Sequence, residues 1–134
     1  MSDRICYITI NARPSNITVI SAYAPTNDHD LAVRSVFFNT LQAVIANVPH
    51  GHFLVVGLDA NAKLGQSFPA NRSVGPLSTG VQCENGSFLR DLCLALNLAV
   101  ANTFFQHKLK QKVTWCSPNG KTKNEINYIF VRSR

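Results

Sequence analysis

The chain has 134 residues, 46% of them hydrophobic, and a formal net charge of +6. This length and apolar content suit one domain with its own core and argue against two domains. No apolar stretch reaches the length of a membrane span, and the N-terminus lacks the long apolar run of a signal peptide. We therefore expect an intracellular protein, nuclear or cytoplasmic, that does not use a membrane.

The positive charge is concentrated near the C-terminal end of the chain. Up to residue 103, six basic residues balance six acidic ones, whereas the remainder has seven basic residues and one acidic residue, Glu125. A clustered positive field attracts polyanions such as nucleic acids, and the alternative is a solvated basic loop. The seven basic residues are Lys108, Lys110, Lys112, Lys121, Lys123, Arg132 and Arg134.

The four cysteines stand far apart in the sequence. None belongs to a Cys-x-x-Cys pair or to a Cys/His cluster with zinc-ligand spacing. We expect Cys6, Cys83, Cys93 and Cys116 to be reduced thiols, most of them packed in the interior.

The first elements are predicted to be a hairpin and a helix. Residues 4–10 and 16–23 are rich in β-branched and aromatic side chains, and the segment 11–15 between them has turn residues. Apolar positions then recur at helical spacing over about 29–47, and residues 26–28 offer side chains that can cap this helix.

The middle of the chain predicts a buried strand, a long loop and a second helix. Residues 52–58 form a continuous apolar run, which is typical of a strand covered on both faces and places Asp59 at its carboxyl end. The segment 62–83 is predicted to be a loop, and loops of this length are usually functional or mobile. A helix over about 86–97 follows, with Asn85 as its cap.

The last third predicts three short strands. One lies near residues 98–102, and the runs 113–116 and 125–131 are predicted to pair across the turn 117–120, where Asn119-Gly120 is a strong turn signal. Strands, helices and hairpins are mixed along the chain. The fold class is therefore α/β or α+β with a mixed sheet.

Asp59 and Asn61 are the first candidates for chemistry because functional residues of open α/β sheets gather at the carboxyl ends of strands. A carboxylate there can accept a proton from water or contact a metal ion, and an amide can donate to a phosphate oxygen. The alternative is a local Asx turn, which Asp and Asn favour at strand ends. The spacing alone leaves both readings open.

Three segments in this order resemble the endonuclease/exonuclease/phosphatase superfamily. They are Ile20-Ser21-Ala22-Tyr23-Ala24-Pro25-Thr26, Gly57-Leu58-Asp59-Ala60-Asn61-Ala62-Lys63-Leu64-Gly65, and Val113-Thr114-Trp115 followed by Asn124-Glu125-Ile126-Asn127-Tyr128-Ile129. Within the superfamily, the pattern is most similar to the apurinic-type endonuclease domains of non-LTR retrotransposons and to craniofacial-development-protein-2-like proteins. The resemblance implies part of a four-layer α/β sandwich, in which mixed sheets are flanked by helices.

The resemblance also implies roles for the residues that match its motifs. Asp59 would orient or deprotonate the attacking water, Asn61 would hold the scissile phosphate, and Tyr23 would line the same site. Trp115 would lie near the nucleotide pocket. Without the resemblance, the favoured interpretation of Tyr23 is a strand-end tyrosine packed under a loop, and a lone tryptophan in a strand is more often part of the core.

The two lysines after Trp115 complete the expected interface, since Lys121 and Lys123 would meet backbone phosphates of DNA. The complete family domain uses Mg²⁺, which is held by a glutamate in an N-terminal motif that does not occur in residues 1–134. The family's C-terminal Ser-Asp-His segment is also not found, and Asn127 stands where the family has an aspartate that orients the histidine. We therefore expect a partial domain whose own Mg²⁺ binding is doubtful.

The missing motifs predict that this chain alone is inactive or nearly so. The comparable Asp-to-Asn change in a serine-protease triad lowers the rate by about 10⁴-fold. Exposed strand edges would also invite pairing with missing domain segments or with another chain. The first functional hypothesis is a fragment of a Mg²⁺-dependent DNA endonuclease of retrotransposon type. The alternatives are a non-catalytic module that binds nucleic acid or protein, and a phosphodiesterase for lipid head groups.

Overall fold

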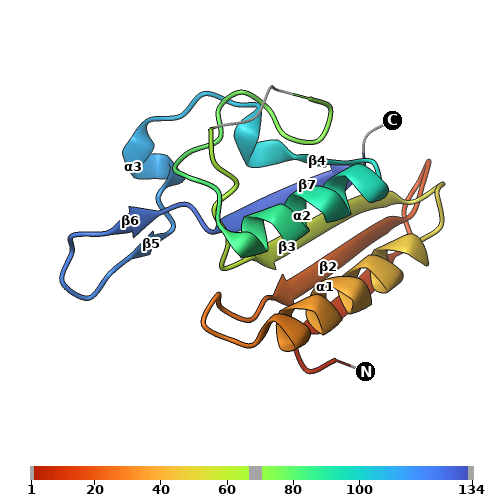
Figure 1. Cartoon of the computed structure of the whole chain (residues 1–134). Helices are drawn as coiled ribbons and strands as arrows, with labels where there is room; N and C mark the ends of the chain where they lie inside the picture. Colours follow the sequence, from red (N-terminus) through yellow and green to blue (C-terminus); the bar gives the residue numbers. More distant parts are fainter. Residues whose placement is uncertain (1, 67–70, 133–134) are drawn as a thin grey trace.

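The computed structural model describes residues 2–66 and 71–132. They form a main sheet, which helices cover on one face, and a separate hairpin that projects from it (Figure 1). The N-terminal half comprises β1 (Ile5–Ile10), β2 (Ile17–Tyr23), α1 (Leu31–Ala46) and β3 (Phe53–Asp59). The remaining elements are α2 (Glu84–Ala95), β4 (Leu98–Val100), the 3₁₀ turn η1 (Ala101–Thr103), α3 (Leu109–Lys112), β5 (Trp115–Cys116), β6 (Lys123–Asn124) and β7 (Asn127–Arg132).

The main sheet is mixed, as the sequence predicted. Its five strands lie in the order β1-β2-β3-β7-β4, and β5 and β6 form a separate two-stranded ribbon. Strands β2 and β3 are parallel and are connected through α1, whereas β1–β2, β3–β7 and β4–β7 are antiparallel. Because β2 and β3 are parallel, their carboxyl ends lie at the same edge of the sheet. Strand β7 is antiparallel to β3 and begins at that edge.

Helices α1 and α2 cover one face of this sheet (Figure 1). The sheet contributes Ile20, Val56 and Phe130, each at most 1% exposed, to a single core. The two helices contact each other through the stacked rings of Phe38 and Phe88, whose centroids are 5.3 Å apart. Burial of such side chains is the main stabilising contribution to a domain of this size.

The opposite face of the sheet is open and apolar. Side chains alternate between faces along each strand, so the neighbours of the core residues point away from the helices. On that face Ile8, Phe53 and Ile129 remain 61%, 49% and 51% exposed. The prediction that residues 52–58 are covered on both faces is therefore wrong for this chain, because the described residues supply a layer on one side only.

Neither predicted helix cap occurs. Helix α1 begins after Asp30, which makes no capping side-chain bond, while Asn27 donates instead to the carbonyl oxygen of Asn61. Residue Asn85 lies inside the first turn of α2, whose N-cap is Cys83. Both asparagines instead make hydrogen bonds to residues near the ends of β2 and β3. A capping signal in the local sequence does not reveal such long-range partners.

The predicted pairing of 113–116 with 125–131 is wrong. The turn at 117–120 is present, but β5 pairs with the short strand β6, and β7 runs in the main sheet between β3 and β4. The chain leaves the ribbon after Asn124, and the carbonyl oxygen of Ile126 accepts a bond from the backbone of Ala60 beside β3. The turn at 117–120 therefore predicted that β5 belongs to a hairpin, but it did not predict the partners of β7, the longer and more apolar strand.

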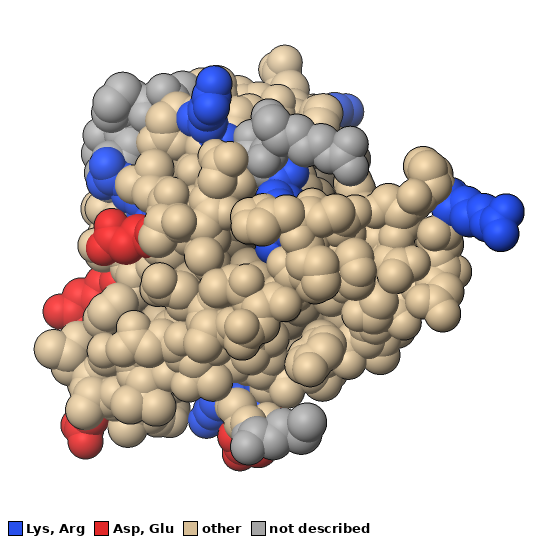
Figure 2. Space-filling model, turned by 90° about the vertical axis from the view of Figure 1, so that its right-hand side faces the viewer, with Lys and Arg blue, Asp and Glu red and all other residues tan. Residues whose placement is uncertain are grey.

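The basic C-terminal third does not form one continuous cluster. Lys112 is buried, and Arg132 donates to the carbonyl oxygens of Ile45, Val48 and Pro49 at the end of α1. Four exposed lysines, at positions 108, 110, 121 and 123, remain on α3 and the β5–β6 ribbon. Figure 2 shows the end of the molecule turned away from this ribbon, where charged residues are scattered over a mainly uncharged surface.

The thiols are free, as predicted, but they are less buried than predicted. Cys93 is buried, Cys83 is half-buried, and Cys6 and Cys116 are exposed. The predicted loop 62–83 contains no helix or strand in its described part, and residues 67–70 lie outside the described chain. Among the described helices, none has the length and apolarity needed to cross a membrane.

Candidate functional site

Three of the predicted catalytic residues form one row across neighbouring strands. Tyr23 ends β2 and is in register with Asp59, which ends β3, and Asp59 is paired with Asn127, which begins β7. All three lie on the open side of the sheet, because the residues next to them face the helices. The row lines an opening of about 590 Å³, together with Asn102 and Thr114 among others.

The carboxylate of Asp59 also takes part in a local turn. Its Oδ1 accepts a 3.2 Å hydrogen bond from the backbone N–H of Asn61. The Asx-turn alternative is therefore present in the structure. It does not compete with a chemical role, because an ionised carboxylate offers about four lone-pair sites and this bond uses one.

Asn61 has an unusual backbone and faces a second opening. Its φ is 43°, in the left-handed region, and its Nδ2 donates to the carbonyl oxygen of Ala24 at 2.9 Å. Together with Lys63 and Trp115 it lines an opening of about 370 Å³. Asp59 and Asn61 therefore serve two different openings at the end of β3.

The predicted nucleic-acid-binding residues are brought together only in part. Trp115 is 41% exposed on β5, so it does not belong to the core and its ring is available in the same opening as Asn61. Lys123 pairs with Cys116 in the ribbon register and therefore points to the opposite face from Trp115. Lys121 is exposed in the turn between the two strands.

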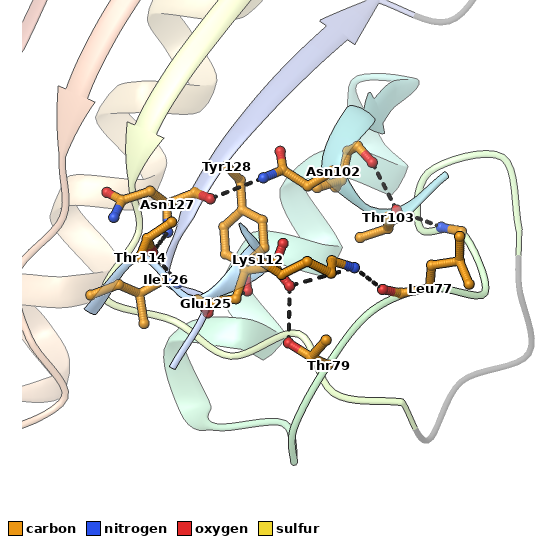
Figure 3. Close-up of polar contacts among 12 residues, drawn as sticks. Leu77, Thr79, Asn102, Thr103, Lys112, Thr114, Glu125, Ile126, Asn127 and Tyr128 are labelled. Carbon is orange, nitrogen blue, oxygen red and sulfur yellow. Dashed lines mark hydrogen bonds and ion pairs between the residues drawn. The ribbon is translucent and has the colours of Figure 1, made fainter. Parts of the chain in front are cut away.

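Asn127 is held in place by two residues to which the sequence analysis assigned no role (Figure 3). Asn102 donates from Nδ2 to the carbonyl oxygen of Asn127 at 3.2 Å and accepts from the N–H of Ile129 at 2.8 Å. Thr114 Oγ1 accepts from the N–H of Asn127 at 3.2 Å. Thr114 lies within a segment that carried the family resemblance, which is the signal that could have singled it out, whereas Asn102 lies outside those segments.

A buried ion pair connects the segments that lie beside the row (Figure 3). Lys112 Nζ lies 3.7 Å from Glu125 Oε2, and the two side chains are only 7% and 2% exposed. Thr79 donates to the same carboxylate oxygen at 2.9 Å, and Lys112 also donates to the carbonyl oxygen of Leu77. The pair thus connects α3, the loop around residues 77–79 and the segment that leads into β7.

Tyr128 connects the segment of Glu125 with the loop that follows β3. Its hydroxyl lies 2.9 Å from the carbonyl oxygen of Glu125 and 3.2 Å from that of Ala62, and it has one proton to donate to them. Burial, and next the negative charge of Glu125, raise the pKa of the Tyr128 phenol above its ordinary value. The neutral phenol is therefore a stable donor between β7 and the loop that follows Asn61.

The residues of the row supply at most part of a Mg²⁺ site. No group of three or more His, Cys, Asp or Glu residues that could hold a metal occurs within residues 2–66 and 71–132. Asp59 supplies one carboxylate, and its neighbours supply only an amide and a phenol. Protein Mg²⁺ sites use one or two carboxylates and complete the octahedron with waters and substrate phosphates. We therefore assign no chemical step of this chain to a metal.

The chain resembles known proteins in both sequence and fold. No known family profile matches it. It is 34% identical over 134 residues to craniofacial development protein 2 of Tragulus javanicus and to that of Bos taurus, and spans 23% and 22% of their lengths. Its fold is similar to that of the endonuclease domain of TRAS1, a telomere-specific non-LTR retrotransposon, with a TM-score of 0.65 and 18% identity.

This likeness covers 97% of the present chain and 51% of the TRAS1 endonuclease chain. The predicted α/β architecture with a mixed sheet is thereby confirmed. The chain has an endonuclease-like fold and spans about half the length of the solved endonuclease chain that it matches.

Proposed function

We propose that this chain supplies one wall of a phosphodiesterase site that hydrolyses DNA in the complete, Mg²⁺-dependent domain. The observation that carries the proposal is the row of Tyr23, Asp59 and Asn127 across three neighbouring strands. The carboxylate of Asp59 would orient or deprotonate water, and Tyr23 and Asn127 would flank it with groups that can hydrogen-bond a phosphate. Asn61, two residues beyond Asp59, would hold the scissile phosphate.

The other wall, including the carboxylate that holds Mg²⁺ and the histidine that contacts phosphate, is proposed to come from segments outside this chain. Two observations support this. The run Phe53–Leu58 is apolar on both faces, yet residues 2–66 and 71–132 cover only one of them. The chain also spans only 51% of the solved endonuclease domain. A second layer on the open face would bury the exposed apolar side chains and would place its own groups opposite the row.

A nucleic acid is the proposed substrate rather than a lipid head group. Trp115 offers an exposed aromatic face on which a base or sugar can stack, and it shares an opening with Asn61 and Lys63. The exposed lysines of α3 and of the ribbon would contact phosphates on either side of the cleaved bond. The four cysteines are free in the structure, which fits the proposed nuclear or cytoplasmic location.

The first test compares the chain with its Asp59→Ala variant in a Mg²⁺-dependent plasmid-nicking assay. We expect both to remain at background, because the metal carboxylate and the histidine are not supplied. Rapid nicking by the wild-type chain that Asp59→Ala abolishes would overturn the proposed need for a second wall, although it would confirm the nuclease chemistry.

A binding assay separates this proposal from a non-catalytic binding module. With a fluorescent DNA duplex at low salt and without Mg²⁺, Asp59→Asn should strengthen binding several-fold, because it removes a negative charge that faces the phosphate. A module that binds through its basic surface would be indifferent to Asp59. Its affinity would instead fall, with a smaller salt dependence, when Lys121 and Lys123 are both replaced by Ala.

A further inference from the structure

Asn85 occupies a buried position between the loops that follow β2 and β3. It lies in the first turn of α2 and is 0% exposed. Its Nδ2 lies 2.8 Å from the carbonyl oxygen of Pro25, 3.4 Å from that of Ala60 and 3.3 Å from that of Asn61. One amide group therefore touches the backbone of the loops that follow Tyr23 and Asp59, two residues of the row.

The same residue is fixed from its other side. Its Oδ1 lies 3.4 Å from Nη1 of the buried Arg34, and its backbone N–H donates to Asn27 Oδ1 at 3.1 Å. Asn27 in turn donates from Nδ2 to the carbonyl oxygen of Asn61 at 3.3 Å. The amide orientation of Asn85 is thus determined by a donor on one side and by carbonyl acceptors on the other.

These contacts converge on the residue with the least favourable backbone conformation in the row's vicinity. Asn61 has a φ of 43°, in the left-handed region that residues other than glycine adopt uncommonly, although asparagine does so more readily than most. Its carbonyl oxygen accepts from both Asn85 and Asn27. The left-handed turn allows the chain to bend directly after Asp59, which keeps the Asn61 side chain in the opening beside Trp115.

We propose that Asn85 is a positioning residue, which holds Asn61 in its left-handed conformation and sets the separation of the β2 and β3 end loops. This proposal rests on the proposed function for its chemical meaning, since Asn61 is the group assigned to the scissile phosphate. Displacement of a reacting group by about 1 Å can lower a rate by about 100-fold. The close approach of α2 supports the geometry, because a Cβ at Gly86 would collide with the carbonyl oxygen of Lys63.

The test replaces Asn85 by Asp, which retains the size and the Oδ1 acceptor and removes the donor to the three carbonyl oxygens. The matched control is Asn39→Asp, at an exposed position in the middle of α1. Amide hydrogen exchange is followed by NMR at Asn61 and Ala60, with Val56 in the core of β3 as the internal reference. This measurement uses the chain itself and does not depend on catalysis.

In the Asn85→Asp variant we expect exchange at Asn61 and Ala60 to accelerate by at least about tenfold, with exchange at Val56 and the control variant unchanged. Equal acceleration at all three amides would mean that Asn85 only stabilises the fold, and no acceleration would mean that the loops do not need it. Either result overturns the proposal. If Asn85→Asp fails to fold, Asn27→Ala, at an exposed residue, removes the second donor to Asn61 and is judged by the same three amides.

A second readout links the position of Asn61 to its proposed task. A dinucleotide that contains one phosphodiester is titrated without metal, and the NMR signal of the Asn61 side-chain amide is followed. Binding should weaken several-fold in Asn85→Asp and remain unchanged in Asn39→Asp. If the wild-type chain does not bind the dinucleotide while the exchange result holds, the proposed function fails and the positioning role stands. If binding is equal in both variants, the positioning role fails.

Discussion

The buried ion pair between Lys112 and Glu125 allows a quantitative prediction, because a second described ion pair is shorter but has its carboxylate in solvent. Both side chains of the first pair are almost fully buried at an Nζ–Oε2 distance of 3.7 Å. The second pair, Arg34 with Glu84, is closer at 2.7 Å, but the Glu84 side chain is 73% exposed. Distance alone therefore predicts that replacement of Glu84 lowers the free energy of unfolding more than replacement of Glu125 does. Burial predicts the opposite.

The expected effects follow from these two geometries. At an effective dielectric constant of about 20, unit charges 3.7 Å apart attract by about 4 kcal/mol, and removal of one partner of a buried pair typically costs about 3–5 kcal/mol. Glu125→Gln retains an acceptor for Thr79, so we expect a loss near the lower limit, about 3 kcal/mol. Glu84→Gln should cost about 1 kcal/mol or less, because solvent screens an exposed carboxylate.

Urea unfolding followed by circular dichroism measures both variants. With a slope of about 2 kcal/mol per molar urea, Glu125→Gln should lower the midpoint by about 1.5 M, and Glu84→Gln by about 0.5 M or less. The double change Lys112→Met with Glu125→Leu should recover most of the loss, since no buried charge is left unpaired. Equal midpoint shifts for the two glutamates, or a larger shift for Glu84, would refute the reasoning.

Two further outcomes follow from the packing of α2 and its surroundings. Gly86→Ala should destabilise the chain by about 1–3 kcal/mol, because the added methyl collides with the Lys63 carbonyl oxygen, whereas Gly51→Ala meets open space and should change the urea midpoint little. Burial raises the pKa of the Cys93 thiol from 9.0 to about 12, so its stabilising contribution is complete below pH 9 and is lost as the pH rises toward 12. Urea midpoints at about pH 8 and about pH 10.5 should therefore differ less in Cys93→Ala than in the wild type. If the two midpoints differ as much in Cys93→Ala as in the wild type, Cys93 does not cause the pH dependence of stability.

The fold was predictable where local signals and long-range packing agree. The hairpin of β1 and β2, the helix α1 and the strand β3 were all predicted within a few residues, because each shows a clear local pattern: a run of β-branched, aromatic or apolar residues for the strands and apolar residues at helical spacing for α1. The pairing of β7 was not predictable from the turn at Asn119-Gly120, because that turn determines only the nearest ribbon. The destination of β7 depends on the apolar face of β3, which lies far away in the sequence.

The sequence selects residues for the candidate site, and their roles stay predictions, but it does not give their arrangement. The resemblance selected Tyr23, Asp59 and Asn127, and the structure places them in one row. It also selected Lys123, which the ribbon register turns away from Trp115. Asn85 was misread as a helix cap, because an asparagine at a helix start is favoured for capping and only the tertiary structure reveals the backbone carbonyls it contacts.

The most direct test of the account is an NMR titration that maps where a phosphodiester binds on this chain. The probe is a dinucleotide with a single phosphodiester, added without metal to the ¹⁵N-labelled protein. The account predicts that the perturbed signals belong to Tyr23, Asp59, Asn61 and Asn127, and that Asp59→Asn strengthens binding. Perturbation confined to the helical side of the sheet, or to the ribbon lysines with no change along the row, would contradict the assignment of this strand-end row as the wall of a phosphodiesterase site.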